Sequence, residues 1–285
     1  MACDWLLVDG SSLIFRAYHG IPAEGARSPD GRLVNAVRGS LDSLARLITQ
    51  RRPRHVAVAD DADWRPWWRV ELLPSYKTHR AAEPVPPPLI PQLRMIRELL
   101  GAVGVDMVGL DGYEAEDVIA TWATLAGGEV EIYSGDRDLF GLIEDPRVRV
   151  LYPERSGLNV IDEAEVTRRY GVPGRRYADF AILRGDPSDG LPGLRGVGAG
   201  TAAQLVRRWG GVEEMLRDAS LRDADRDYLA RALQVVSPTR ELPLTLPAGR
   251  RDSYPADPAK LSELLAGSGV EGSCSRLVAA LAATA

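Results

Sequence analysis

Residues 5–12 have the sequence WLLVDGSS, and this stretch decides the fold. Four apolar residues in a row predict a buried strand, and the Asp-Gly-Ser-Ser that follows is typical of a helix start. The same order recurs downstream, where apolar strands at 55–59 and 129–133 also run into aspartates. Apolar residues at helical spacing lie between these strands, at 34–50, 93–100 and 113–126. We therefore predict an α/β fold with a parallel, or mixed, sheet and helices on both faces.

The chain changes character after about residue 162. Up to that point strands alternate with helices, and two further strands are expected at 105–108 and 148–151. Beyond it, helical segments follow one another at 163–170, 176–183, 201–209 and 222–234. We therefore predict two domains, an α/β core at 1–160 and a mostly helical region at 161–285.

Composition limits the kinds of protein that this chain can be. Of its 285 residues, 45% are hydrophobic and 26% are charged, as in an ordinary globular protein. No apolar run reaches the roughly 18 residues of a membrane span, and the N-terminus lacks a signal-peptide pattern. The two cysteines, Cys3 and Cys274, exclude a disulfide scaffold and a zinc cage, and they fit a reducing cytoplasm.

Acidic side chains occur where strands end and where the next helices begin. Asp9 follows the first strand, Asp60 follows the second, and Asp136 and Asp138 follow the strand that ends at residue 133. In open parallel sheets the crevice beyond the carboxyl ends of the strands is the usual ligand site. The full set of candidates is Asp9, Asp60, Glu114, Glu116, Asp117, Asp136, Asp138, Asp186 and Asp189.

Nine carboxylates gather at one place only with a counter-charge, because like charges repel and burial favours the neutral form. Hard divalent cations such as Mg²⁺ take oxygen ligands and offset that cost. Without these nine, the formal net charge of −5 becomes +4, so the acidic composition does not exclude a nucleic-acid partner. Taken singly, each acid also has an ordinary interpretation, as a helix cap or as a partner of the helix dipole.

Seven short motifs resemble those of the 5′ nuclease superfamily, which comprises the 5′→3′ exonuclease domain of bacterial DNA polymerase I, phage 5′ nucleases and flap endonucleases. They occur in family order, and together they are far more specific than any one of them. The motifs are LVDGS at 7–11, VAD at 58–60, SYKTHR at 75–80, GYEAEDV at 112–118, SGDRDL at 134–139, GDPSDGLPG at 185–193 and GVGAGTA at 196–202.

The resemblance implies a PIN-like nuclease core that hydrolyses DNA with two or more bound Mg²⁺ or Mn²⁺ ions. It places around the first ion Asp9, Asp60, Glu114, Glu116 and Asp117. It places Asp136 and Asp138 near both ions, and Asp186 and Asp189 at the second. The implied catalytic group is Lys77, Arg80, Asp136 and Asp138. In this group Lys77 and Arg80 are implied to hold the scissile phosphate.

The resemblance also implies where DNA binds. Residues 61–90 correspond to the helical arch of the family, through which a 5′ single strand passes. Residues 185–210 correspond to a helix–hairpin–helix (H3TH) element, which approaches duplex phosphates and often holds K⁺. The implied DNA contacts are Arg16, Tyr76, Lys77, Arg80, Arg195, Gly196, Gly198, Gly200 and Thr201. Tryptophans of the arch alternate with basic residues, and they form either a stacking surface for single strands or the core of the arch.

Three residues depart from the family pattern. Glu116 stands where Asp is frequent, which lengthens the arm of one carboxylate. Gly190 replaces a frequent Asn, and Gly200 replaces a frequent Lys, which removes one phosphate contact from the hairpin. The last of these departures puts the affinity for duplex DNA in question, and the fold is unaffected.

Together these features predict a structure-specific 5′ nuclease, a flap endonuclease and 5′→3′ exonuclease that acts at single-strand/duplex junctions in replication and repair. The expected partners are DNA with 5′ flaps or 5′ ends and RNA primers. The expected state is a monomer in the bacterial cytoplasm, at the nucleoid, either freestanding or as an excised domain. Two alternatives stay open, a PIN-class ribonuclease and a catalytically weak DNA-junction binding protein.

Overall fold

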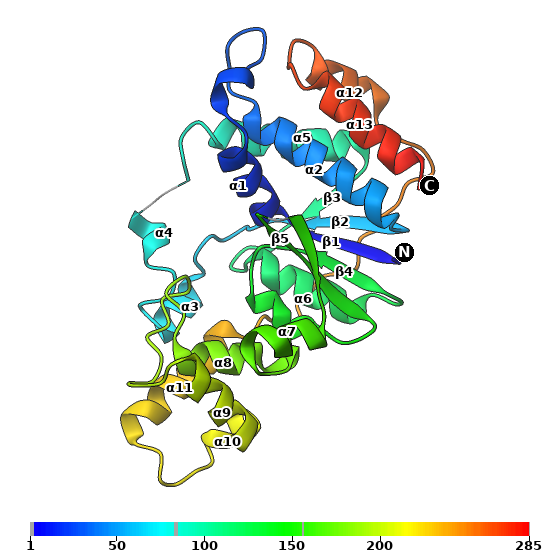
Figure 1. The fold of residues 1–285 in the computed structure, drawn as a ribbon. Helices are drawn as coiled ribbons and strands as arrows, with labels where there is room; N and C mark the ends of the chain where they lie inside the picture. The colour runs from blue at the N-terminus through cyan, green and yellow to red at the C-terminus, as the bar shows by residue number, and fades with distance from the viewer. Residues whose placement is uncertain (1–2, 83–84, 156, 285) are drawn as a thin grey trace.

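A six-stranded mixed sheet forms the centre of the molecule (Figure 1). The computed structural model describes residues 3–82, 85–155 and 157–284. The strands are β1 (Trp5–Asp9), β2 (His55–Ala59), β3 (Asp106–Val108), β4 (Val130–Tyr133), β5 (Val148–Glu154) and β6 (Gly157–Ile161). Their order is β3-β2-β1-β4-β5-β6, and all neighbours are parallel except β5 and β6. The predicted α/β fold with a mixed sheet is confirmed, although the sequence pattern did not predict β6.

Helices cover both faces of the sheet because side chains of each strand point alternately to one face and the other. Leu6 and Val8 of β1 pack in one core with α1, α2 and α5, whereas Leu7 packs in a second core with α6 and α8. The α-helices are α1 (Gly10–Gly20), α2 (Asn35–Arg51), α3 (Trp67–Leu72), α4 (His79–Ala82), α5 (Ile90–Val103), α6 (Ala115–Leu125), α7 (Glu163–Tyr170), α8 (Tyr177–Arg184), α9 (Ala199–Trp209), α10 (Val212–Met215), α11 (Asp223–Val236), α12 (Pro258–Leu265) and α13 (Glu271–Ala282). Short 3₁₀ turns are η1 (Ala23–Gly25), η2 (Asp138–Leu142) and η3 (Gly174–Arg176).

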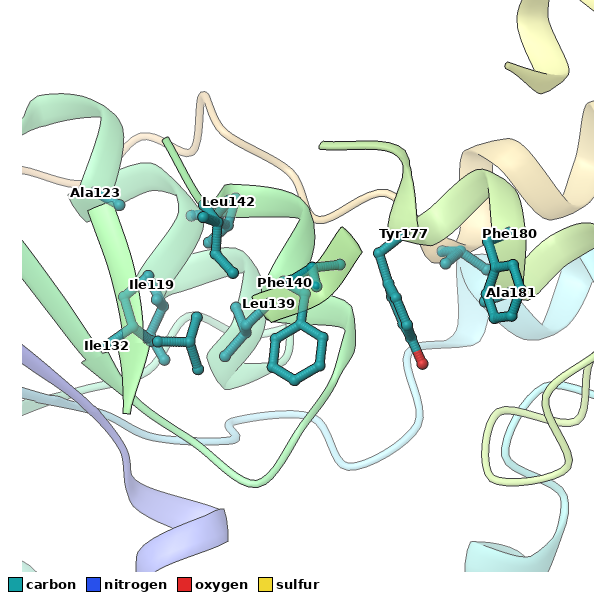
Figure 2. Packing of buried hydrophobic residues seen from close by; sticks show 14 of the residues in the cluster. Ile119, Ala123, Ile132, Leu139, Phe140, Leu142, Tyr177, Phe180 and Ala181 are labelled. Carbon is teal, nitrogen blue, oxygen red and sulfur yellow. The ribbon is translucent and has the colours of Figure 1, made fainter. Parts of the chain in front are cut away.

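The second core continues from the sheet into the helical region (Figure 2). Ile132 of β4 packs among residues of α6, and the Phe140 ring of η2 lies edge-on to Tyr177 of α8, with 5.3 Å between ring centroids. Because η2 also begins with Asp138, the burial of Phe140 fixes the position of that carboxylate.

The last two helices return to the first core. α13 packs against α2 and α12 against α5, and their buried residues include Leu261, Cys274 and Leu277. Figure 1 shows α12 and α13 at one end of the molecule and α8 to α11 at the other. The predicted helical region at 161–285 is therefore divided in space, because the apolar face of α13 completes the core around α2.

The predicted arch at 61–90 carries two short helices, α3 and α4. Residues 83 and 84, which lie at the start of its proline-rich end, are outside the described residues. In the described part of the chain, no helix has both the length and the apolar content needed to cross a membrane. Cys3 and Cys274 are buried free thiols.

Candidate active site

The site lies where the strand order of the sheet changes direction. The chain builds outward from β1 to β2 and β3, and it then returns to add β4 on the other side of β1. The carboxyl ends of β1 and β4 therefore border a crevice, which is the usual ligand position in such sheets. Asp9 ends β1 and caps α1 by accepting a hydrogen bond from the Ser12 amide at 2.9 Å. The Ser134 hydroxyl, at the end of β4, donates to Asp9 at 2.6 Å.

A cavity of about 530 Å³ opens at this crevice. Of the nine predicted carboxylates, those that line it are Asp9, Glu114, Glu116, Asp136 and Asp189. Lys77 and Arg80 line it too, opposite in charge to these acids. The structure therefore brings the predicted catalytic cations and five of the predicted metal-binding acids to one cavity.

Three carboxylates lie close enough together to share one cation. Glu116, Asp136 and Asp138 each offer an oxygen, and these oxygens lie within 4.8 Å of one another. Burial, together with the charges of Asp189 and Asp136, raises the pKa of Asp138 well above its usual range. An all-oxygen donor set of three carboxylates suits a hard divalent cation.

Asp60 was predicted as a metal ligand, and the structure places it elsewhere. Its carboxylate forms an ion pair with Arg97, which is largely exposed, and it does not line the cavity. The next residue, Asp61, lines the cavity, where it accepts hydrogen bonds at 2.6 Å from the Ser11 hydroxyl and from the Ala115 amide. Burial raises the pKa of Asp61. The correction arises because β2 ends at Ala59 and consecutive residues beyond it point to different sides.

Two other predicted acids lie behind the cavity with their oxygens already engaged. Asp117 accepts hydrogen bonds from the amides of Glu114 at 3.2 Å and Thr239 at 2.7 Å, which completes a capping box on α6. Asp186 accepts from the Arg137 guanidinium at 2.9 Å and from the Ser188 amide at 3.0 Å. Both therefore support the site from behind, because they do not line the cavity.

Glu114 gathers most of the positive charge in the site. Its carboxylate accepts hydrogen bonds from the Tyr76 hydroxyl at 2.6 Å, from Lys77 Nζ at 2.9 Å and from Arg80 Nη1 at 2.8 Å. It also pairs with Arg69. Burial acts to raise the pKa of Glu114, but Lys77 and Arg69 outweigh it and lower the value to about 2. Glu114 is therefore ionised at neutral pH.

Lys77 is held inside the protein by both its side chain and its backbone. The residue is 2% exposed, and its Nζ lies 3.6 Å from Asp189. Its φ of 44° is in the left-handed region, where a side chain is strained, and its amide donates to the Asp189 carbonyl at 3.1 Å. Strain of this kind persists only where the surrounding contacts enforce it, and here they aim the ammonium group at the acids.

The predicted DNA contacts divide into exposed and buried groups. Arg16, Arg195, Gly196, Gly198, Gly200 and Thr201 are exposed. Tyr76, in contrast, is buried with its hydroxyl bonded to Glu114, because the arch packs this ring against the core. A direct DNA contact by Tyr76 is thus not what the structure shows, and its position instead indicates a support for Glu114.

The tryptophans of the arch divide between the two interpretations, a core of the arch and a stacking surface. Trp68 donates to the Gly112 carbonyl at 3.0 Å, and so it belongs to the arch core. Trp64 lines the cavity, and its ring lies 4.5 Å from the guanidinium of Arg80 and 5.0 Å from the ring of Phe15. Trp67 is 69% exposed and is free to stack.

Arg69 is a site residue that the sequence did not reveal. Its side chain is completely buried and contacts Glu114, Glu116 and Asp117. No local signal identifies it, because its partners follow 45 to 48 residues later in the chain.

Gly190 departs from the family pattern for a reason that the structure gives. Its φ is +71°, and a Cβ atom here would lie 1.9 Å from the Ser75 carbonyl oxygen. We expect Gly190→Ala to destabilise the protein by about 2 kcal/mol or more, because the backbone that carries Lys77 must move. Thermal unfolding measures this, with Gly127→Ala as the control, since a Cβ at Gly127 meets no atom within 4 Å. Equal stability of the two variants would contradict the clash.

Two protein-family models match the chain. The model described as "5'-3' exonuclease, N-terminal resolvase-like domain" matches residues 4–171, and "5'-3' exonuclease, C-terminal SAM fold" matches residues 172–243. A 5'-3' exonuclease from Streptomyces coelicolor is 46% identical over 98% of this chain and 100% of its own length. One from Mycobacterium tuberculosis is 44% identical over 97% of each chain. DNA polymerase I of Mycobacterium bovis is 39% identical over 83% of this chain and 26% of the polymerase.

Solved structures share the fold. The T5 D15 protein co-crystallised with metal ions has a TM-score of 0.69 at 17% identity, over 98% of both chains. A variant of the same phage flap endonuclease, solved as a pseudo-enzyme-product complex with DNA and metal ions, has a TM-score of 0.66 at 17% identity, again over 98% of both chains.

Proposed function

Because the chain belongs to the 5'-3' exonuclease family, we propose that it is a structure-specific 5′ nuclease that cleaves DNA at single-strand/duplex junctions with divalent metal ions. One observation carries this proposal. The oxygens of Glu116, Asp136 and Asp138 converge at the switch point of the sheet, beside a cavity that Lys77 and Arg80 also line. Carboxylates that can bind metal ions and cationic side chains that can bind phosphate therefore line the same cavity, where a substrate can enter.

The donor set fits divalent cations. Glu116, Asp136 and Asp138 would hold one ion, and Asp9, Asp61 and Asp189 add further carboxylates to the lining of the same cavity. When bound, Mg²⁺ or Mn²⁺ supplies a Lewis acid that activates water and stabilises the leaving oxygen of a phosphodiester. All six of these donors are carboxylates, so they favour oxygen-bound cations of the hard class.

Lys77 and Arg80 hold the scissile phosphate beside these acids. Arg80 is only partly buried and stacks over Trp64, so its guanidinium can reach an entering phosphate while the ring excludes water. Lys77 is set deeper, and it offsets the charge that develops on the phosphate oxygens. The arch segment that carries both residues is thus the part that positions the 5′ strand.

Duplex DNA is proposed to bind at the hairpin between α8 and α9. Gly196 has a φ of +79° and lies exposed in this loop, with Gly198 at the N-cap of α9. Exposed glycines let backbone amides approach phosphates, and the positive end of the helix dipole favours an anion. We include K⁺ at this hairpin in the proposal, on the family resemblance.

Gly200→Lys should strengthen the binding of duplex DNA. Gly200 lies in the first turn of α9, and a Cβ atom there meets nothing within 4 Å. We expect about threefold to tenfold tighter binding at low salt and an increase of about one in the slope of log affinity against log salt, because one phosphate contact is added. Fluorescence anisotropy with a labelled duplex measures both. The control is Gln204→Lys, an exposed position one turn along the same helix. An equal gain in the control would contradict a contact made by the hairpin.

The substrates proposed are DNA with 5′ flaps or 5′ ends and the RNA primers attached to it, processed by a monomer in the cytoplasm near the nucleoid. The similarity to DNA polymerase I and to a phage flap endonuclease solved with DNA supports DNA as the partner. The exposed hairpin and the arch, both on one chain, support action as a monomer.

A 5′-labelled flap duplex incubated with Mg²⁺, Mn²⁺ or EDTA tests the proposal, with Asp136→Asn as the inactive control. We expect cleavage at the junction that needs metal and is lost in the variant. Junction binding without cleavage would replace the nuclease by a binding protein. Cleavage confined to single-stranded RNA would move the chain to the PIN-class ribonucleases.

A further inference from the structure

The Arg69 side chain is buried against three acids of one helix turn. Its Nη1 donates to Glu114 and, at 2.6 Å, to Glu116, and its Nη2 donates to Asp117 at 2.7 Å. All three acids lie at the start of α6, whereas Arg69 lies on α3 of the arch. A single guanidinium therefore ties the base of the arch to the first turn of α6.

Aromatic rings exclude water from these ion pairs. The guanidinium carbon lies 5.0 Å from the ring centroid of Trp68 and 5.6 Å from that of Tyr76. Ion pairs are stronger in such an environment than in water, and a buried charge that loses its partner is strongly unfavourable. The acids of α6 consequently depend on Arg69 for their charge balance.

Protein cations neutralise only one side of the site. Glu114 pairs with Arg69, Lys77 and Arg80. In the described part of the chain, no Lys or Arg nitrogen lies within 4.0 Å of a carboxylate oxygen of Asp9, Asp61, Asp136 or Asp138. Negative charge without a counter-ion is therefore concentrated on the side of the cavity formed by β1, β2 and β4.

We propose that Arg69 is a positioning residue that acts as a built-in counter-ion of the metal site. It neutralises the acids of the first turn of α6, so that divalent cations are drawn toward the acids of the cavity that follow β1, β2 and β4, which have no protein cation within 4.0 Å among the described residues. This inference rests on the proposed metal site. It requires that loss of Arg69 leaves the acids of α6 free to attract a cation of their own.

Binding of Mn²⁺ to Arg69→Met tests this without reference to cleavage. Met has a similar length and no charge, so the acids of α6 lose their buried counter-ion. We expect Arg69→Met to bind Mn²⁺ about tenfold more tightly than wild type, or to take up about one additional ion per chain, as measured from the free Mn²⁺ signal in electron paramagnetic resonance. Its melting temperature should also rise more steeply with added Mn²⁺ than that of wild type.

Two variants serve as controls. Arg65→Met removes an arginine of the same segment that donates only to backbone carbonyls, of Tyr76 at 2.6 Å and of Pro74 at 2.9 Å, and it should leave Mn²⁺ affinity unchanged. Arg69→Lys keeps the charge but lacks the planar fork, and it should restore the Mn²⁺ affinity to near the wild-type value.

The outcomes are distinct. Mn²⁺ affinity in Arg69→Met that equals or falls below the wild-type value overturns the counter-ion role. If metal-free Arg69→Met is unfolded, the proposal requires that Mn²⁺ refolds it, and failure to refold also overturns the role. Absence of Mn²⁺ binding by wild type would instead contradict the metal site itself, which separates the two failures.

Discussion

Asp61→Asn should lower the rate of flap cleavage by about 100-fold or more, whereas Asp60→Asn should leave it within about twofold of wild type. The two residues are neighbours in the chain and carry the same charge. They differ in place, because Asp61 lines the cavity with hydrogen bonds to Ser11 and Ala115, and Asp60 pairs with Arg97 outside it.

The comparison is matched by design. Each variant removes one negative charge at nearly the same point of the sequence, so a general electrostatic effect would lower both rates equally. Cleavage of the labelled flap duplex across a series of Mg²⁺ concentrations measures the difference. If Asp60→Asn is the impaired variant, the assignment of Asp61 to the site is wrong.

The metal-free protein should lose stability as the pH rises from about 4 to about 7. Burial, with the charge of Asp61 next, raises the pKa of Asp9 to about 7. In the unfolded chain the same group has the ordinary value of 3.8. Between these values the folded state binds the proton more tightly, so its stabilising effect is present at low pH and is lost as the pH rises through the folded pKa. A difference of about three pH units corresponds to roughly 4 kcal/mol.

Divalent cations should reverse this trend, because they bind the ionised carboxylate and displace its proton. Apparent metal affinity should therefore fall by up to about tenfold for each pH unit below 7 and level off above it. Thermal unfolding in EDTA and in Mg²⁺, from pH 5 to pH 8, measures both effects. In Asp9→Asn the pH dependence of the metal-free protein should be flatter. An unchanged pH profile in that variant would assign the dependence to other acids of the cavity.

The order of strands and helices could be predicted because each apolar run and each amphipathic repeat is local. Strand β6 could not be predicted in this way, because it is a five-residue edge strand with an exposed Val160 and no apolar run. The positions of α12 and α13 could not be predicted either. An amphipathic pattern indicates that one face of a helix is buried, but it does not identify the element against which that face packs. For α13 the partner is α2, more than 200 residues earlier in the chain.

The site was predictable to the extent that strand ends define it. Asp9 and Asp136 were identified because parallel strands end at the same edge of the sheet. The choice between Asp60 and Asp61 depends on where β2 stops to within one residue, which an apolar run does not fix. The role of Arg69 could not be predicted, because it rests on ion pairs between the arch and α6, and only the folded structure shows this contact.

Lys77 and Lys260 are the only lysines of the sequence. Lys260 is exposed and pairs with Glu263 on the surface of α12, while Lys77 is sealed between the arch and the acids. An amine-acylating reagent thus has two lysine targets, one exposed and one buried. Lys260 reports the concentration of reagent, and Lys77 reports how often the arch lifts from the cavity. The ratio of the two labels, read by mass spectrometry with no engineered probe, gives the opening equilibrium of the arch and its response to DNA.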